Sequence, residues 1–133
     1  MRACIATMLD LEIDAVPNFI RFDSKRRAKT RTGWFEVFYS FLHALGYEYQ
    51  GMQWPKNKDR PHGDYLKKSP NINGLVMATV PSRTFKDIGH SVVVNLKGIV
   101  VHDPNPNKLW QGINVLKSKD LQHWMMIQKK VKR

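Results

Sequence analysis

Residues 89–106 constrain the fold of this chain more than any other stretch, because they carry two β-branched runs that flank a tight turn. The first run spans 90–96 and the second spans 99–103, and only Lys97-Gly98 separates them. A pair of this kind suits a two-residue hairpin loop. Two prolines then end the second run, since proline cannot donate to a strand ladder. We therefore expect an antiparallel hairpin here.

The register of this hairpin decides which side chains share a face. A two-residue loop would pair Leu96 with Ile99 and make His90 and Asp103 diagonal neighbours on one face. An imidazole beside a carboxylate is the arrangement of an oriented general base. The alternative is a three-residue loop with a bulge at Gly98. That loop would slip the pairing by one residue and turn Asp103 toward the other face.

The sequence before the hairpin is helical. Residues 2–9 are almost wholly apolar and predict a short, buried helix. A longer helix is expected from about Trp34 to Leu45, where apolar residues recur with i, i+3, i+4, i+7 spacing and form a stripe assigned to the core. Thr32 is the expected N-cap of this helix, and Gly46 is the expected residue after its C-cap.

Further strands are expected at 47–52, 75–80 and 123–128. Residues 53–73 hold three prolines and several lysines, which indicates a long and mostly exposed connection. Helices thus come first and an antiparallel meander follows. This order predicts an α+β fold, and a chain of 133 residues has the length of a single domain, 1–133.

The charge of the chain keeps a binding function open. Lysine and arginine number 22 against 11 acidic residues, which gives a net charge of +11. Such a field attracts nucleic acid or an acidic protein. The densest positive run is either a solvated loop or a weak binding patch, and it consists of Lys25, Arg26, Arg27, Lys29 and Arg31. A non-enzymatic binding protein of this kind would lose affinity steeply with salt, but no nucleic-acid motif accompanies the run.

Several classes of protein are excluded or disfavoured. No apolar run approaches the roughly 20 residues that span a bilayer, and the N-terminus lacks the pattern of a signal peptide. Cys4 is the only cysteine, so an internal disulfide and a multi-cysteine metal site are excluded. His102 and Asp103 are adjacent on a strand and point to opposite faces, which argues against a metal site shared with His90. We expect a cytoplasmic protein with no membrane partner, no metal and no cofactor.

Four short segments, in this order along the chain, carry a resemblance to a known family. They are Cys-Ile-Ala-Thr-Met-Leu at 4–9, Val-Pro at 16–17, Gly-His-Ser-Val-Val at 89–93 and Val-His-Asp-Pro at 101–104. Together they resemble papain-like cysteine peptidases, and more closely the leader-peptide peptidase domains of bacteriocin exporters and small bacterial or phage proteins of that type. The resemblance covers residues 1–17 and 89–106. It implies a papain-like fold, with N-terminal helices packed on an antiparallel sheet, and a peptide or protein substrate.

The resemblance also implies roles for individual residues. His90 corresponds to the general base, and Asp103 to the acid that orients it. Cys4 corresponds to a residue one helical turn beyond the nucleophile, whose place falls immediately before Met1. Either the chain as given starts too late or the protein is an inactive relative, and we expect no peptidase activity from it. Cys4 could replace the nucleophile only if residues 1–3 were not helical, so that Cys4 began the helix.

Overall fold

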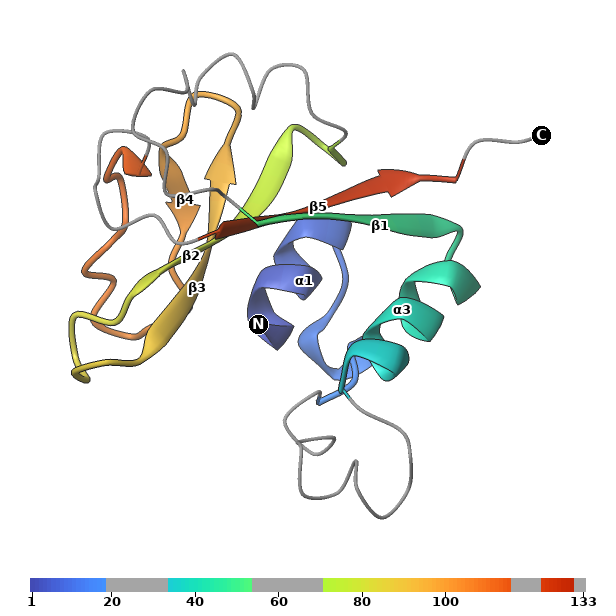
Figure 1. Cartoon of the computed structure of the whole chain (residues 1–133), viewed down its shortest axis with the longest axis horizontal. Helices are drawn as coiled ribbons and strands as arrows, with labels where there is room; N and C mark the ends of the chain where they lie inside the picture. The colour runs from blue at the N-terminus through green and yellow to red at the C-terminus, as the bar shows by residue number, and fades with distance from the viewer. Residues whose placement is uncertain (19–33, 54–70, 116–122, 131–133) are drawn as a thin grey trace.

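A computed structural model describes residues 1–18, 34–53, 71–115 and 123–130. Within these ranges, five strands form one antiparallel sheet in the order β1-β5-β2-β3-β4, and two α-helices pack on one side of it (Figure 1). The elements are α1 (Arg2–Leu9), the 3-10 turn η1 (Ile13–Ala15), α3 (Trp34–Ala44), β1 (Tyr47–Gln53), β2 (Leu75–Pro81), β3 (Gly89–Asn95), β4 (Val100–His102) and β5 (His123–Lys129). The α+β class expected from the sequence is therefore confirmed.

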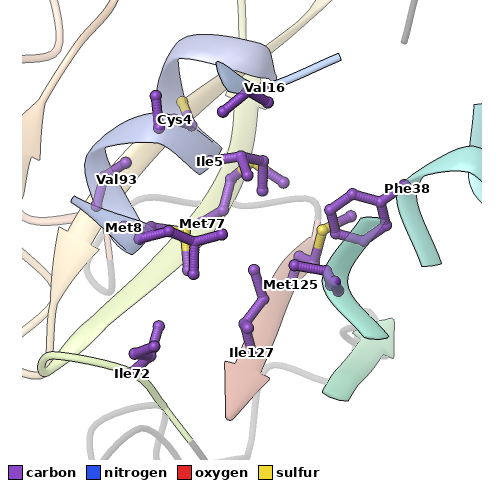
Figure 2. Close-up of a cluster of buried hydrophobic side chains, with 13 residues drawn as sticks. Cys4, Ile5, Met8, Val16, Phe38, Ile72, Met77, Val93, Met125 and Ile127 are labelled. Carbon is purple, nitrogen blue, oxygen red and sulfur yellow. The ribbon is translucent and has the colours of Figure 1, made fainter. Parts of the chain in front are cut away.

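Helix α1 lies where the apolar stretch at 2–9 predicts it and is the most deeply buried element of the helical layer. Figure 2 shows Cys4, Ile5 and Met8 of α1 directed into a cluster that also holds Met77 and Met125 of the sheet. The helix ends at Asp10, which has a left-handed φ of 54°. Backbone hydrogen bonds to the carbonyls of Ala6 and Thr7 cap this end, and the burial of the apolar side chains stabilises the helix as a whole.

Helix α3 confirms the longer predicted helix, with Phe38 and Leu42 fully buried against the sheet. Gly46 follows its end with φ +85°, as a glycine after a C-cap does. The assignment of Leu45 to the buried stripe is wrong, because the helix ends at Ala44 and the Leu45 side chain is 45% exposed. The predicted N-cap lies outside the described residues. Neither α-helix is long and apolar enough to cross a membrane, within the part of the chain described.

The strand order corrects the expected meander. The C-terminal strand β5 lies between β1 and β2, where Ile127 pairs with Tyr49 and Met125 pairs with Met77. Met125, Met126 and Ile127 are consecutive and all buried, so both faces of β5 are covered. A strand with apolar residues on both faces is most stable in the interior of a sheet, which explains why β5 takes this position.

The prediction of an exposed connection over residues 53–73 is wrong at both ends of that range. Gln53 belongs to β1, whereas residues 54–70 lie outside the described ranges. Ile72 is 5% exposed and joins the core below α1. The next residue, Asn73, donates from Nδ2 to the carbonyl oxygen of Met8 at 3.0 Å, which satisfies a carbonyl at the end of the helix.

Two hydrophobic clusters lie on opposite faces of the sheet. One lies under the helices and includes Met77 and Val93. The other holds mainly valines and is closed by Trp110 and Val115, which follow β4 in the chain. Alternation along β3 sends Val92 and Val93 to different clusters, so this strand contributes to both cores.

Candidate active site

The turn between β3 and β4 differs from the two-residue loop predicted by the sequence. The backbone N–H of Asn95 donates to Ile99 O at 3.0 Å, and the Gly98 N–H donates to Asn95 O at 3.0 Å. Asn95 therefore faces Ile99 across a three-residue loop, and the predicted pairing of Leu96 with Ile99 is wrong. Gly98 has φ +84°, a left-handed conformation that glycine adopts without steric cost, and it is the bulge residue of this loop.

A second irregularity in the same hairpin restores the register. Val94 pairs with Val100, whereas Val93 pairs with His102, so the ladder between these two fully described strands gives Val101 no partner. This bulge moves the pairing by one residue in the direction opposite to the shift at the turn. The two shifts cancel, and Asp103 therefore lies on the face predicted for it.

His90 and Asp103 meet at this end of the hairpin. His90 Nε2 lies 2.7 Å from Asp103 Oδ1, which is a short hydrogen bond of the length found when a charged group takes part. The Asp103 side chain is 1% exposed and the His90 side chain is 19% exposed. The predicted contact between the two residues is thus present, although the loop that makes it is not the one expected.

Three hydrogen bonds surround the buried Asp103 carboxylate. Oδ1 accepts from His90 and from the Asn105 N–H at 2.9 Å, and Oδ2 accepts from the Trp110 N–H at 3.0 Å. Burial alone would raise the pKa of this carboxyl group, but these donors and the charge of His90 outweigh it and lower the pKa below its ordinary value. Asp103 is therefore ionised at neutral pH and can only accept hydrogen bonds.

This ionisation fixes the proton on His90. Because the carboxylate accepts, His90 Nε2 must carry a hydrogen and donate it to Asp103. In the neutral ring Nδ1 is then the unprotonated atom and is available as a base. The pair has the parts of an oriented general base, in which an acid holds the tautomer and direction of an imidazole.

Cys4 lies close to this pair but in the core. Its side chain is 0% exposed, and its Sγ donates to the backbone oxygen of Ser91 at 3.3 Å. Burial raises the pKa of the thiol to about 11; the N-terminal amino group opposes this shift, and the charge of Asp103 adds to it. Cys4 is therefore a neutral thiol at pH 7. Residues 2 and 3 are helical, so the condition under which Cys4 would begin the helix is not met.

The same contacts locate the start of α1 relative to the pair. The helix packs against β2 and β3 (Figure 1), and the hydrogen bond of Cys4 joins its first turn to the residue next to His90. Cys4 also senses the charge of Asp103. The first turn of α1 thus lies beside the end of β3 that carries His90.

The other candidate residues do not join this site. The basic run Lys25, Arg26, Arg27, Lys29 and Arg31 lies outside the described residues. His102 is adjacent to Asp103 in the chain, and its Nε2 is buried without a hydrogen-bond partner among the described residues. No group of three or more His, Cys, Asp or Glu side chains that could hold a metal ion occurs within the described ranges.

Sequence reasoning missed the segment that follows the aspartate. Trp110 and Gln111 both bond to Asp103, Trp110 at the carboxylate and Gln111 at the backbone N–H. Asn105 also donates to the carboxylate. An Asx turn after Asp103 could have been anticipated from the Asp-Pro-Asn sequence, because aspartate often accepts from a backbone N–H two residues on. Nothing in the pattern of the sequence indicates the contacts made by Trp110 and Gln111.

No family model matches the chain, and neither a curated protein nor a solved structure does. The geometry around His90 and Asp103 is therefore the observation that bears on function.

Proposed function

We propose that this chain is a papain-like cysteine hydrolase domain of the peptidase or amidase type. One observation carries the proposal: His90 Nε2 is bonded at 2.7 Å to a buried aspartate, at a strand end beside the first turn of a helix. Cysteine hydrolases need a base held in one tautomer next to a thiol at a helix N-terminus. The order of elements agrees with the family resemblance noted in the sequence.

The proposed reaction uses His90 twice. In the first step a thiol transfers its proton to His90 Nδ1, and its sulfur forms a bond with the carbonyl carbon of a peptide or amide. The leaving amine takes the proton from His90 as the carbon–nitrogen bond breaks. In the second step His90 takes a proton from water, the resulting hydroxide attacks the thioester, and the thiol is released. Asp103 stays ionised throughout and holds the ring in place.

The family resemblance implies a nucleophile immediately before Met1, and Cys4 does not fit that role. Cys4 is four residues beyond that position, about 6 Å along a helix axis, and its raised pKa opposes thiolate formation. A thiol at the start of α1 would instead lie near the positive end of the helix dipole, which lowers a thiol pKa. The proposed reaction requires this thiol to reach His90 as well.

The test supplies this cysteine. Met-Gly-Cys is placed directly before Met1 in a Cys4→Ala background, so that the chain holds one thiol. At pH 7 we expect iodoacetamide to label this thiol about tenfold faster than an ordinary cysteine, because a helix start and an adjacent imidazole favour the thiolate. Adding His90→Ala should abolish the acceleration.

A remote histidine serves as the matched control. His43 lies on α3 with its ring tilted against that of Tyr39, away from the hairpin, so His43→Ala should leave the labelling rate unchanged. Hydrolysis of peptide or amide substrates by the chain with the added cysteine is then measured against the same chain with serine at that position. A labelling rate that does not depend on His90 would overturn the proposal.

A further inference from the structure

The bulge at Val101 leaves backbone groups outside the β3–β4 ladder, and one side chain bonds to them. Gln111 Nε2 donates to Val101 O at 2.8 Å, and Gln111 Oε1 accepts from the Asp103 N–H at 3.0 Å. A single amide therefore bridges the backbone groups on either side of His102. It holds Val101 and Asp103 in the spacing that turns the carboxylate toward His90.

Gln111 extends a backbone pairing that already lines the outer edge of β4. The Val100 N–H donates to Ile113 O, and the Gly112 N–H donates to Val100 O, both at 2.9 Å. This backbone pairing stops at Gly112, and the Gln111 side chain bonds to the next groups of the strand. The side chain thus substitutes for a ladder at the point where the bulge prevents one.

The neighbouring residue anchors this segment to the other hairpin. The Trp110 side chain is 3% exposed, and its Nε1 donates to Pro81 O at 3.1 Å. Pro81 pairs with Gly89, the residue before His90. The Arg83 guanidinium lies 3.9 Å from the centre of the Trp110 ring and covers it. The backbone next to Gln111 is therefore anchored by Trp110, whereas the Gln111 side chain itself is exposed and is held by the two hydrogen bonds it makes.

We propose that Gln111 is a positioning residue of the His90–Asp103 pair. It acts through Asp103, by fixing the bulge that sets which face the carboxylate occupies. A catalytic role for Gln111 rests on the proposed function. Its effect on the contact between His90 and Asp103 does not. A one-residue slip of a strand turns its side chains to the opposite face. A side chain that sets the register of β4 therefore also sets whether Asp103 faces His90.

The test measures the Nε2 proton of His90 in the full chain by proton and nitrogen NMR, with the resonance assigned by its loss in His90→Ala. In the wild-type chain this proton is held by a buried carboxylate, so its exchange with water is slow. Gln111→Met keeps the length of the side chain and removes both hydrogen bonds. We expect the exchange rate of the His90 proton to rise about tenfold, and Tm to fall by about 2–6 °C.

A second glutamine provides the matched control. Gln128 Nε2 donates to Glu48 Oε2 at 3.2 Å on the far strands of the sheet, so Gln128→Met removes a hydrogen bond without touching the hairpin. It should leave the exchange rate of the His90 proton at the wild-type value. If Gln111→Met does not fold, Gln111→Asn keeps the amide but is too short to span both partners, and the same rise is expected.

The outcome separates this inference from the proposed function. A wild-type exchange rate in the folded Gln111 variant, with or without a lower Tm, would show a merely structural role and overturn the inference. That result would leave the thiol-labelling experiment unaffected. Conversely, thiol labelling that is indifferent to His90 would overturn the proposed function, while a faster proton exchange in Gln111→Met would still establish that Gln111 positions the pair.

Discussion

The two hairpins that share β3 are built differently. The β2–β3 hairpin pairs seven residues from each strand in an unbroken register, from Leu75 with Asn95 to Pro81 with Gly89. The β3–β4 hairpin has a bulge residue at its turn and a second bulge at Val101. The regular hairpin forms core on both faces, whereas the irregular one carries the only buried charged side chain among the described residues. The two departures from a regular register cancel between the turn and Asp103, so the polar group lies on the face that regular alternation predicts for it.

The largest expected effect comes from removing that charged group. Asp103→Ala leaves His90 and the backbone N–H groups of Asn105 and Trp110 without their acceptor in a buried site. We expect the free energy of unfolding to fall by about 3 kcal/mol or more, since each unsatisfied buried donor is costly. Urea denaturation at pH 7 measures it. Ser91→Ala, a polar truncation on the regular side of β3, should cost about 0.5 kcal/mol or less.

A smaller effect is expected at the turn of the irregular hairpin. Gly98→Ala forces a side chain into a left-handed conformation and should cost about 1–2 kcal/mol. Gly74 precedes the regular hairpin, has φ +69° and has open space around it, so Gly74→Ala should cost about 1 kcal/mol through backbone strain alone. Only the Gly98 variant should also speed the exchange of the His90 Nε2 proton. Equal exchange rates in the two variants would contradict the link between the turn and the site.

The same contrast explains what could be predicted from the sequence. The helix at 2–9 and the strands at 75–80 and 90–96 follow from their continuous apolar runs, and each of them buries consecutive side chains. The loop after Asn95 is the three-residue alternative with a bulge at Gly98, because Lys97-Gly98 suits a two-residue loop and a three-residue loop ending in glycine alike.

The His90–Asp103 contact was predicted through a register that is wrong at the turn. Two one-residue shifts cancel between the turn and Asp103, so the faces come out as expected. The second shift depends on Gln111, which bonds to the bulged strand from ten residues further along the chain than Val101. Such a contact is set by tertiary structure and leaves no periodic signal. The central position of β5 was missed for a related reason, because pairing partners are not encoded in alternation.

An acid-dependent loss of stability should distinguish the hairpins further. Burial opposes the charged form of Asp103, but its hydrogen bonds lower its pKa in the folded chain, so the contribution of the carboxylate is present above the ordinary range of an aspartate. This contribution to stability is lost as the pH falls through the ordinary pKa range of an aspartate toward the lower pKa of Asp103 in the folded chain. Urea denaturation gives the free energies of unfolding of the wild-type chain and of Asp103→Asn. We expect the difference between them, which favours the wild-type chain at pH 7, to shrink as the pH is lowered. A difference that stays constant would contradict the lowered pKa.

The smallest effect on stability is expected at Cys4, which touches the strand common to both hairpins. Cys4→Ala removes one buried sulfur and its bond to Ser91 O and should cost about 1 kcal/mol or less. In the folded chain, iodoacetamide should modify Cys4 slowly at pH 7, because its pKa is about 11 and its side chain is buried. His90→Ala should not change that rate. Rapid modification that disappears in His90→Ala would instead make Cys4 the nucleophile.

The central claim is that the irregular hairpin brings Asp103 and His90 into one energetically coupled unit, and a double-mutant cycle tests it most directly. Urea denaturation at pH 7 gives the free energies of unfolding of the wild-type chain, His90→Ala, Asp103→Ala and the double variant. We expect a coupling energy of about 1–3 kcal/mol, as for a buried hydrogen bond to a charged group. Additivity of the two substitutions to within about 0.3 kcal/mol would show that the two side chains do not interact, and would contradict the account.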